Sequence, residues 1–327
     1  MDWKGKKVLV TGAGGFIGSH LTERLVALGA HVRAMIHYNA LGGCGWLDGS
    51  PARDRIEVVA GDICDRDSVV AAMKDVEIVF HLAALIGIPY SYRNPGSYVR
   101  TNVEGTLNVL QAARKWGVQR LIHTSTSEVY GTARYTPIDE NHSLQGQSPY
   151  SASKIGADKI AEAFFFSFDV PVSVARPFNT FGPRQSNRAV IPTIISQCLE
   201  RRRVVLGSLE PTRDFNYVEN TVEGFVAIAS SSAAVGKTIN LGSGREISIG
   251  ALATLIADLT GCKVSLDTDA QRIRPDQSEV KRLVADNTLA RSLLSWEPAV
   301  SLENGLRTTI EWIRTYGTRS QPDEYSV

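Results

Sequence analysis

Cysteine is scarce in this chain and never closely spaced. The 327 residues contain four cysteines, Cys44, Cys64, Cys198 and Cys262, with no Cys-x-x-Cys pair among them. This spacing excludes a disulfide framework and argues against a structural zinc site. We therefore expect no bound metal and a cytoplasmic location.

An excess of charge and long apolar runs are also missing. The formal net charge is +1, which gives no sign of a nucleic-acid-binding surface. No apolar run reaches the length of a transmembrane helix, and the N-terminus lacks the apolar core and cleavage site of a signal peptide. With 43% hydrophobic and 21% charged residues, the composition is typical of a globular protein without nucleic-acid or membrane partners.

Short apolar strands alternate with helical patterns over the first half of the chain. The predicted strands cover residues 7–11, 32–36, 56–60, 77–84, 120–123 and 172–176. This alternation predicts an α/β protein with a Rossmann-type doubly wound parallel sheet. We assign residues 1–176 to an NAD(P)-binding domain, to which residues 215–243 return, and residues 177–327 mainly to a smaller mixed α/β substrate domain.

A glycine-rich turn joins the first predicted strand to the first predicted helix. Gly12 permits the tight turn, Gly15 lets the backbone approach a pyrophosphate at the helix N-terminus, and Gly18 lets helix and strand pack closely. The spacing predicts a dinucleotide site that includes Phe16 and Ile17. A glycine turn without a ligand is the alternative.

The end of the second strand bears on the choice between NAD and NADP. An NAD site usually places an acidic residue there to bind the ribose 2′-hydroxyl, but this chain has His37 nearby and no carboxylate. Arg33 lies within the strand, and no clear pair of arginines is present to recruit a 2′-phosphate. We predict a cofactor contact at His37 and favour NAD slightly.

Two further segments are predicted beside the cofactor. Asp62 and Ile63 follow the third strand, where they can hold an adenine ring, although Asp62 can equally cap the next helix. Leu82, Ala83 and Ala84 end the fourth strand with small residues along the cofactor path.

Candidate catalytic groups lie at the fifth strand and the helix that comes after it. Tyr150 and Lys154 are four residues apart, so on a helix they share one face. An ammonium near a phenol lowers the tyrosine pKa, so Tyr150 can take a proton from a substrate hydroxyl that Thr126 also binds. The spacing alone also fits an ordinary surface pair.

Taken in order, these motifs resemble the nucleotide-sugar branch of the extended short-chain dehydrogenase/reductases. The resemblance runs from about residue 6 to residue 314. It rests on Gly12-x-x-Gly15-x-x-Gly18, Asp62-Ile63, residues 81–84, Thr126, Tyr150-x-x-x-Lys154, residues 176–184 and residues 213–218. It implies a nucleotide-sugar substrate and a tightly bound NAD(P).

Thr126-Ser127-Glu128 distinguishes reactions within that branch. Sugar 4-epimerases usually lack the third-position carboxylate, whereas 4,6-dehydratases carry it, and the GDP-mannose enzymes have Thr-Ser-Glu as here. The chain most resembles the GDP-N-acetylglucosamine 4,6-dehydratases of legionaminic acid biosynthesis, and related UDP-N-acetylglucosamine enzymes share much of the pattern. The motifs of this closer resemblance are residues 45–48, 88–92, 123–131, 148–154, 189–197 and 274–275.

The resemblance assigns each catalytic residue a role. Tyr150, aided by Lys154 and Thr126, removes the proton of the sugar O4 while the C4 hydride passes to the nicotinamide. Glu128 then removes the C5 proton, water leaves from C6, and the hydride returns to C6. Because Ser127 is a poor general acid, the proton for the leaving hydroxyl comes from Glu128 or through a water. The alternative for Glu128 is an ion pair that only orders the loop.

Arginines after residue 177 predict an anionic substrate. Arg184, Arg213 and Arg274 suit bidentate binding of a diphosphate, although each alone is an ordinary surface arginine. We add Tyr90, from an expected substrate-facing loop at residues 88–92, and Asn179.

The end of the helix from residue 150 to 168 is apolar almost all round, with Phe164, Phe165, Phe166 and Phe168. Such a helix is usually covered by more than its own domain, which predicts a homodimer formed with the helix at residues 97–116.

Two other functions remain open at this stage. A sugar 4-epimerase would use the same scaffold without needing Glu128. A non-catalytic NAD(P)-binding regulator has the same fold, but the intact Thr126, Tyr150 and Lys154 argue against it.

Overall fold

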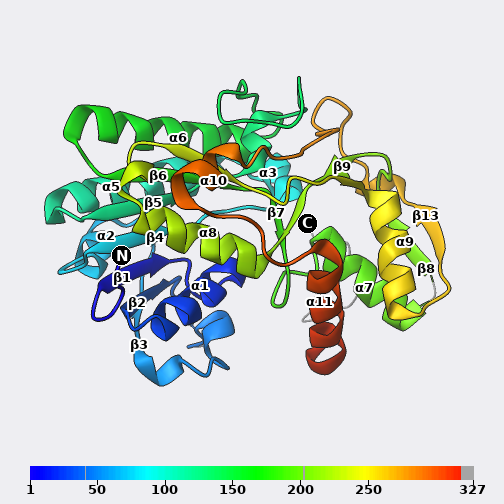
Figure 1. Ribbon diagram of the computed structural model, residues 1–327, viewed down its shortest axis with the longest axis horizontal. Coiled ribbons are helices and arrows are strands. Elements are labelled where there is room, and N and C mark those ends of the chain that lie inside the picture. The colour runs from blue at the N-terminus through cyan, green and yellow to red at the C-terminus, as the bar shows by residue number, and fades with distance from the viewer. Residues whose placement is uncertain (41, 202, 318–327) are drawn as a thin grey trace.

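The computed structural model describes residues 1–40, 42–201 and 203–317, and in them a seven-stranded sheet forms the centre of the molecule (Figure 1). The strand order is β11-β6-β5-β4-β1-β2-β3, and each pairing is parallel. The bounds are β1 Lys7–Thr11, β2 His31–Ile36, β3 Ile56–Ala60, β4 Ile78–His81, β5 Arg120–Thr124, β6 Val172–Pro177 and β11 Thr238–Leu241. The predicted Rossmann-type sheet is confirmed.

The strands of this sheet carry apolar side chains on both faces. In β1, Val8 and Val10 pack into one core and Leu9 into the other. In β5, Ile122 and Leu121 divide in the same way. A parallel sheet that is apolar on both faces requires a layer of helices on each.

Helices supply both layers (Figure 1). On one face α1 (Phe16–Ala27) packs beside α8 (Val218–Ser230). On the other face α2 (Arg66–Ala72), α5 (Gly105–Trp116) and α6 (Pro149–Phe168) lie side by side. The Ser148 hydroxyl caps α6 by accepting from the Ser151 N–H, which fixes where the helix begins.

A second lobe is built from shorter elements and lies on the right in Figure 1. Its strand pairs are β7 (Asn179–Phe181) with β10 (Phe215–Tyr217), β9 (Thr212–Arg213) with β12 (Ile247–Ser248), and β8 (Arg203–Leu206) with β13 (Ser265–Thr268). Its helices are α7 (Val190–Arg201), α9 (Ile249–Thr260) and α11 (Leu302–Tyr316), while α10 (Thr288–Leu294) packs near β11 and α8. The assignment of the two lobes to dinucleotide and substrate stays a prediction.

Several short turns complete the described chain. They are the 3-10 turns η1 Gly45–Leu47, η2 Arg53–Arg55, η4 Ser127–Tyr130, η5 Ser232–Ala234 and η6 Ala270–Arg272. Residues 88–92 are not the expected loop, because they begin helix α3 (Ile88–Arg93), whose first turn holds Pro89. Proline favours the first helical turn, where its missing N–H is not needed.

The expected helix at residues 97–116 is interrupted. It consists of α4 (Pro95–Tyr98), a π-helical segment, η3 (Val99–Glu104), and then α5. Within the π-helical segment, Asn102 turns its amide inward and binds the backbone of Leu85 through both its oxygen and its nitrogen, each at 2.9 Å. Single π-helical turns often occur at functional sites.

Candidate active site

The glycine turn leaves no room for side chains. Gly12 has φ +70°, and a Cβ there would lie 2.9 Å from the Ala83 backbone nitrogen. A Cβ on Gly18 would lie 2.2 Å from the Gly12 carbonyl oxygen, and one on Gly15 would lie 3.2 Å from it. Among the described residues no side chain caps α1 at Gly15, so its first N–H groups can receive an anion. This cradle fits the pyrophosphate of a dinucleotide.

The end of β4 is held against this turn by a hydroxyl. Thr11 Oγ1 accepts from the backbone N–H groups of Leu82 and Ala83, at 3.2 and 3.1 Å. The same oxygen lies 2.8 Å from His81 Nδ1, and burial lowers the pKa of His81 well below its usual value. Leu82, Ala83 and Ala84 are half-buried beside Gly12, as a cofactor path requires. The sequence reasoning missed Thr11.

A loop after β2 covers the glycine turn. A Cβ on Gly14 would lie 2.5 Å from the Cys44 carbonyl oxygen, and Trp46 N donates to the Gly14 carbonyl at 3.0 Å. The Trp46 ring meets the ring of Trp312 on α11 edge-on, with centroids 5.4 Å apart. The second lobe therefore supports the loop that lies on the glycine turn.

The predicted adenine end is exposed and partly acidic. His37 Nε2 lies 3.8 Å from Asp62 Oδ2, and the His37 side chain is 78% exposed. Arg33 is directed elsewhere, because it pairs with Glu57 at 2.9 Å and donates to the carbonyls of residues 72 and 74. The described structure thus offers no arginine from β2 to a 2′-phosphate.

Other residues predicted at this cofactor site lie in less accessible positions. Asp65, not Asp62, caps α2, and Asp62 accepts instead from Cys64 N at 2.8 Å. The Ile63 side chain is buried in the core, where it packs directly against Gly105 of α5. Phe16 and Ile17 are half-buried in the first turn of α1. The Ile63 side chain thus helps to pack α5 against the sheet, and its contact with an adenine ring stays a prediction.

Tyr150 and Lys154 are both buried on one face of α6, as their spacing predicts. Lys154 Nζ donates to the Thr124 carbonyl at 2.7 Å, and Thr126 is hydrogen-bonded to Tyr150. The Thr126 hydroxyl also accepts from the Glu128 N–H at 3.2 Å. The turn after β5 therefore contacts both groups of the pair.

The pKa values of Tyr150 and Lys154 differ from what the sequence predicted. Burial raises the pKa of Tyr150, and the hydrogen bond from Thr126 only partly offsets this. Burial also lowers the pKa of Lys154 to about 8. The prediction that Lys154 brings the Tyr150 pKa down is wrong for this structure, because desolvation outweighs the ammonium, whose hydrogen bond goes to Thr124.

Glu128 and Ser127 differ in accessibility. Ser127 is buried, whereas Glu128 is partly exposed in η4. Burial lowers the pKa of Arg213, and the Glu128 carboxylate opposes this shift, while it adds to the rise that burial causes in the pKa of Tyr150, so its charge acts on both groups. The structure thus brings together two predicted catalytic residues and one predicted substrate arginine.

Two of the three predicted substrate arginines meet at one carboxylate. Arg213 is buried and donates to Glu279 Oε1 at 2.9 Å, and Arg274 Nη1 lies 3.7 Å from the same oxygen. Arg184 does not join them. It pairs with Glu23 at 3.0 Å and donates to the Ser19 hydroxyl at 3.1 Å, both on α1. Arg184 therefore lies apart from the other two, because the loop after β7 carries it to the first lobe, and its contact with a substrate stays a prediction.

The other two predicted substrate residues take different positions. Tyr90 lies on α3, where its hydroxyl accepts from Asn94 at 3.1 Å. Its ring lies 6.2 Å from that of Tyr98, which lies 6.2 Å from that of Tyr150. Asn179 is half-buried in β7, in register with Phe215 of β10. The three tyrosines form a continuous row that ends at the candidate catalytic phenol.

Residues that the sequence reasoning did not single out support this site. Asn102 donates to the Ser153 hydroxyl at 2.9 Å, and Ser153 donates to the Tyr150 carbonyl at 2.7 Å. Asp158, one helical turn after Lys154, is fully buried and accepts from Ser125 Oγ at 2.7 Å. The spacing of residues 150, 154 and 158 is the signal that could have found Asp158.

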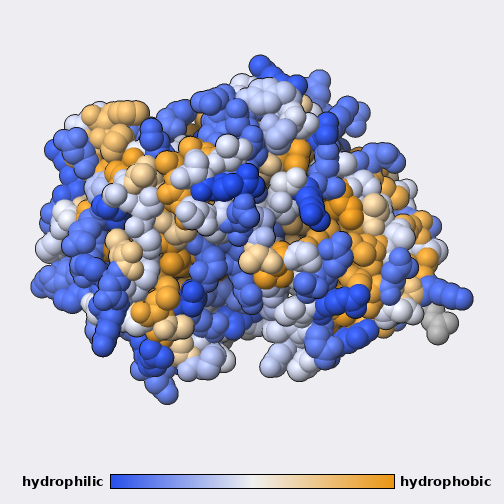
Figure 2. Space-filling view, in the orientation of Figure 1, coloured by the Kyte–Doolittle hydropathy of each residue, from blue (hydrophilic) through white to orange (hydrophobic). Residues whose placement is uncertain are grey.

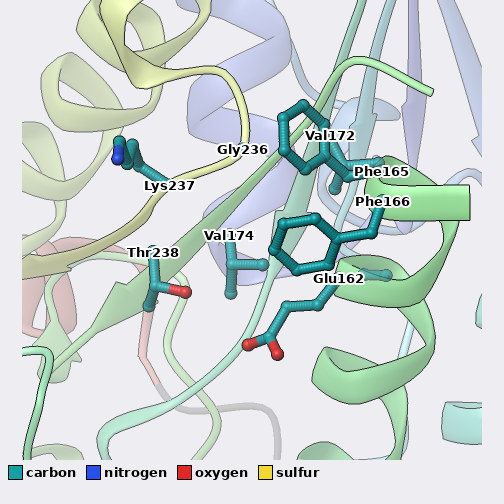
Figure 3. Close-up of a pocket in the computed structure, with 9 residues that line it drawn as sticks. Glu162, Phe165, Phe166, Val172, Val174, Gly236, Lys237 and Thr238 are labelled. Atoms are coloured by element: carbon teal, nitrogen blue, oxygen red, sulfur yellow. The ribbon is translucent and has the colours of Figure 1, made fainter. Parts of the chain in front are cut away.

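A shallow pocket lies away from these groups (Figure 3). It is lined by the end of α6, including Phe165 and Phe166, and by Val172, Val174 and Gly236. It is about fifteen residues along α6 from Tyr150, roughly 22 Å at 1.5 Å per residue. The pocket is therefore separate from the candidate active site.

The described part of the chain provides neither a membrane span nor a metal cluster. None of its helices is long and apolar enough to cross a bilayer, and none of its groups of His, Cys, Asp and Glu could hold a metal ion. On the face shown in Figure 2, hydrophilic side chains are interspersed with smaller apolar groups. The four cysteines are free.

The amino-acid sequence is similar to those of known nucleotide-sugar enzymes. The family profile described as GDP-mannose 4,6 dehydratase matches residues 9–309. A UDP-glucose 4-epimerase of Mycolicibacterium smegmatis is 35% identical over 94% of this chain and 98% of its own length. A dTDP-glucose 4,6-dehydratase of Streptomyces griseus is 32% identical, covering 96% of each chain.

Solved structures give the same result. The dTDP-glucose 4,6-dehydratase from Streptomyces venezuelae, solved with NAD and TYD bound, has a TM-score of 0.86 to this protein. The two share 29% identity over 95% of this chain and 97% of that one. The relatives thus include enzymes of two reaction types on one fold.

Proposed function

Because the chain belongs to the GDP-mannose 4,6-dehydratase family, we propose that it is an NAD-dependent nucleotide-sugar 4,6-dehydratase. Its substrate would be GDP- or UDP-N-acetylglucosamine, and its product the 4-keto-6-deoxy sugar. This is the substrate pair that the sequence motifs favour. The family membership establishes an enzyme of the nucleotide-sugar dehydratase and epimerase type, and the proposal adds the reaction and the sugar.

The observation that carries the proposal is the position of Glu128. It is partly exposed, next to the Thr126 that bonds Tyr150, and its charge acts on the Tyr150 phenol. Oxidation at C4 does not require this carboxylate. Elimination of water across C5 and C6 does require a base, and a carboxylate beside the C4 oxidation site is suitably placed.

The cradle of Gly12, Gly18 and Ala83 would hold the pyrophosphate of the dinucleotide, with its ribose near His37 and Asp62. Asp62 places a carboxylate close to the ribose end, which disfavours a 2′-phosphate and supports NAD over NADP. A nicotinamide bound there would supply a hydride acceptor for C4 and a hydride donor for C6.

The catalytic side chains would move protons at O4, C5 and the C6 hydroxyl of the sugar. Tyr150 takes the O4 proton, with Thr126 donating a hydrogen bond to the phenol and Lys154 supplying a cation in the same buried space. Glu128 removes the C5 proton after C4 has become a ketone. The C6 hydroxyl leaves as water with a proton from Glu128 or a bridging water, since buried Ser127 is a poor acid.

Arg213 and Arg274 would bind the diphosphate of the substrate. Both guanidinium groups converge on Glu279, which holds them in place. A planar guanidinium pairs two phosphate oxygens at once, so two such groups suit a diphosphate. Tyr90 and Asn179 would contact the nucleotide sugar from α3 and β7.

The protein would act as a homodimer through α6 and the helical segment before it. Phe166 is 76% exposed, and Trp116 and Phe168 are also exposed. Phe165 contributes less than expected, because its ring packs directly on Gly236 of its own chain (Figure 3). Exposed aromatic side chains on adjacent helices are typical of an interface.

A 4-epimerase is the second candidate. It is supported by the M. smegmatis relative, which is 35% identical against 32% for the S. griseus dehydratase. Incubation with a panel of nucleotide sugars, followed by product mass spectrometry, separates the two. Loss of one water supports the dehydratase, an unchanged mass with a C4 epimer replaces it by the epimerase, and no turnover of any sugar supports a non-catalytic regulator.

A further inference from the structure

The catalytic pair rests on a buried ionic cluster formed by Asp158, Ser125, His123 and Arg176. Asp158 Oδ2 accepts from Ser125 Oγ at 2.7 Å and from Arg176 at 2.9 and 3.3 Å. Asp158 Oδ1 lies 3.2 Å from His123 Nε2. All four residues are buried, so the cluster is shielded from water.

This cluster connects the two elements that carry the proposed catalytic groups. Asp158 lies on α6, one turn from Lys154 and two turns from Tyr150. Its partner Ser125 stands between Thr124, whose carbonyl accepts from Lys154, and Thr126, which bonds Tyr150. One carboxylate therefore fixes the turn that contacts both catalytic side chains.

We propose that Asp158 is a positioning residue that keeps the Lys154 ammonium charged in the core and holds the Thr124–Thr126 turn against α6. The inference rests on the proposed function in one respect, because it treats the Lys154 charge as needed for proton transfer at Tyr150. The effect of Asp158 on the charge of Lys154 and on the Thr124–Thr126 turn does not depend on which substrate the enzyme takes.

The charge balance favours this role. Burial alone would raise the pKa of Asp158, but the hydrogen bond from His123 and the charge of Arg176 hold it at about 2. Asp158 is therefore ionised throughout the physiological range. Its charge raises the pKa of Lys154, against the larger lowering effect of burial, and the result is about 8. Without Asp158, the lysine would lose its proton at lower pH.

Other ionisable groups face Asp158, Lys154 or the neighbouring Tyr150. They are His81 from β4, His123 from β5, Tyr98 from α4, Glu128 from η4, and Arg176 from β6, with Tyr130 behind Arg176. Burial lowers the pKa of both histidines, so they are neutral at physiological pH. Arg176 is a like charge that cannot help Lys154 keep its proton. Asp158 also raises the pKa of Tyr150, a smaller effect than burial.

The test is a titration of Lys154 in the full chain with ¹³C,¹⁵N-labelled lysine. The Lys154 signal is assigned by its loss in Lys154→Met. In Asp158→Asn the midpoint should fall by about one pH unit or more, as expected on loss of a nearby opposite charge. The alkaline limb of kcat should move down by the same amount. Asp158→Glu, which keeps the charge, should restore a midpoint close to the wild-type value.

Two controls separate positioning from general stability. Glu162→Gln removes a carboxylate from the same helix, where it pairs with exposed Lys159, and should leave the midpoint unchanged. Asp158→Asn leaves the buried Arg176 unpaired and can prevent folding. The double variant Asp158→Asn, Arg176→Met removes both charges and should still show the lowered midpoint.

An unchanged Lys154 midpoint in folded Asp158→Asn, or in the double variant, would overturn the proposal and leave Asp158 a structural residue. A wild-type Lys154 that is already uncharged at pH 7 would overturn it as well. If the wild type converts no nucleotide sugar, the proposed function fails, but the titration still decides the role of Asp158.

Discussion

Glu128 and Tyr150 are electrostatically coupled in the folded protein. Burial is the main cause of the raised pKa of the Tyr150 phenol, and the Glu128 carboxylate adds to it; Thr126 is bonded both to the phenol and to the Glu128 N–H. The proposed acceptor of the O4 proton, Tyr150, and the proposed base for the C5 proton, Glu128, thus lie at one site. Two successive proton transfers on one sugar require this arrangement.

Glu128→Gln keeps the shape of the side chain and removes the base. We expect the variant to reduce its cofactor on adding substrate, because C4 oxidation needs only Tyr150, Lys154 and Thr126. The 4-keto-6-deoxy product should form at least ~100-fold more slowly, since a positioned base contributes ~10²–10⁴-fold. Absorbance at the reduced nicotinamide band and product mass spectrometry measure the two steps separately.

Tyr150→Phe is the matched control, and it should block the first hydride transfer. In heavy water, the wild-type product should gain deuterium at C5, and hydrogen from C4 should reappear at C6 of the same molecule. A Glu128→Gln variant that dehydrates at the wild-type rate would show that the base lies elsewhere. A C4 epimer without solvent label at C5 would favour the epimerase.

Gly12→Ala should remove the dinucleotide. Its φ of +70° costs a side chain about 1–2 kcal/mol. The new Cβ would also lie 2.9 Å from the Ala83 backbone, so the turn must shift. Wild type should copurify with NAD or NADP, identified by mass spectrometry of the denatured protein, and the variant should not.

Gly117→Ala is the control for backbone strain alone. It has a φ of +62°, but a Cβ there meets nothing within 4 Å. It should lose a similar amount of stability and keep its dinucleotide. Equal cofactor content in Gly12→Ala and wild type would contradict the assignment of the cradle, and finding no dinucleotide in the wild type would count against the proposed function.

Phe166→Glu should give a folded monomer. The ring is 76% exposed, so its replacement does not disturb the core of one chain. Sedimentation at micromolar protein concentration measures the change. Tyr316→Glu, at a side chain 72% exposed on α11, should leave the dimer intact. A wild type that sediments as a monomer would refute the interface. Phe165→Glu is a poor test, because its ring packs on Gly236.

Asp158 should contribute stability that is lost in acid. Its folded pKa of about 2 lies below the ordinary 3.8. A depressed carboxyl pKa stabilises the fold above the unfolded value, and this stability is lost as pH falls through the folded value, here between about pH 4 and pH 2. The effect is about 2 kcal/mol. Urea unfolding at pH 6 and pH 2 should show that much less acid loss in the Asp158→Asn, Arg176→Met variant than in wild type.

The sheet and the glycine turn could be predicted because their signals are local. Alternating strands and helices specify a parallel sheet, and the Gly12 turn needs only its own neighbours to be recognised. The same holds for Tyr150 and Lys154, whose common face follows from helical spacing. Residues 88–92, expected as a loop, begin helix α3 instead, because proline is accepted in a first helical turn.

Only the tertiary structure decided how charges far apart in sequence meet. It separates Arg184, which contacts α1, from Arg213 and Arg274, and it brings Ser125, Asp158 and Arg176 together behind the catalytic pair. The pKa of Tyr150 was mispredicted for the same reason, since spacing shows which side chains are near but not how much water their packing excludes. Burial depends on all the elements packed around a group, so it emerges only once β4, β5, β6 and α6 are assembled.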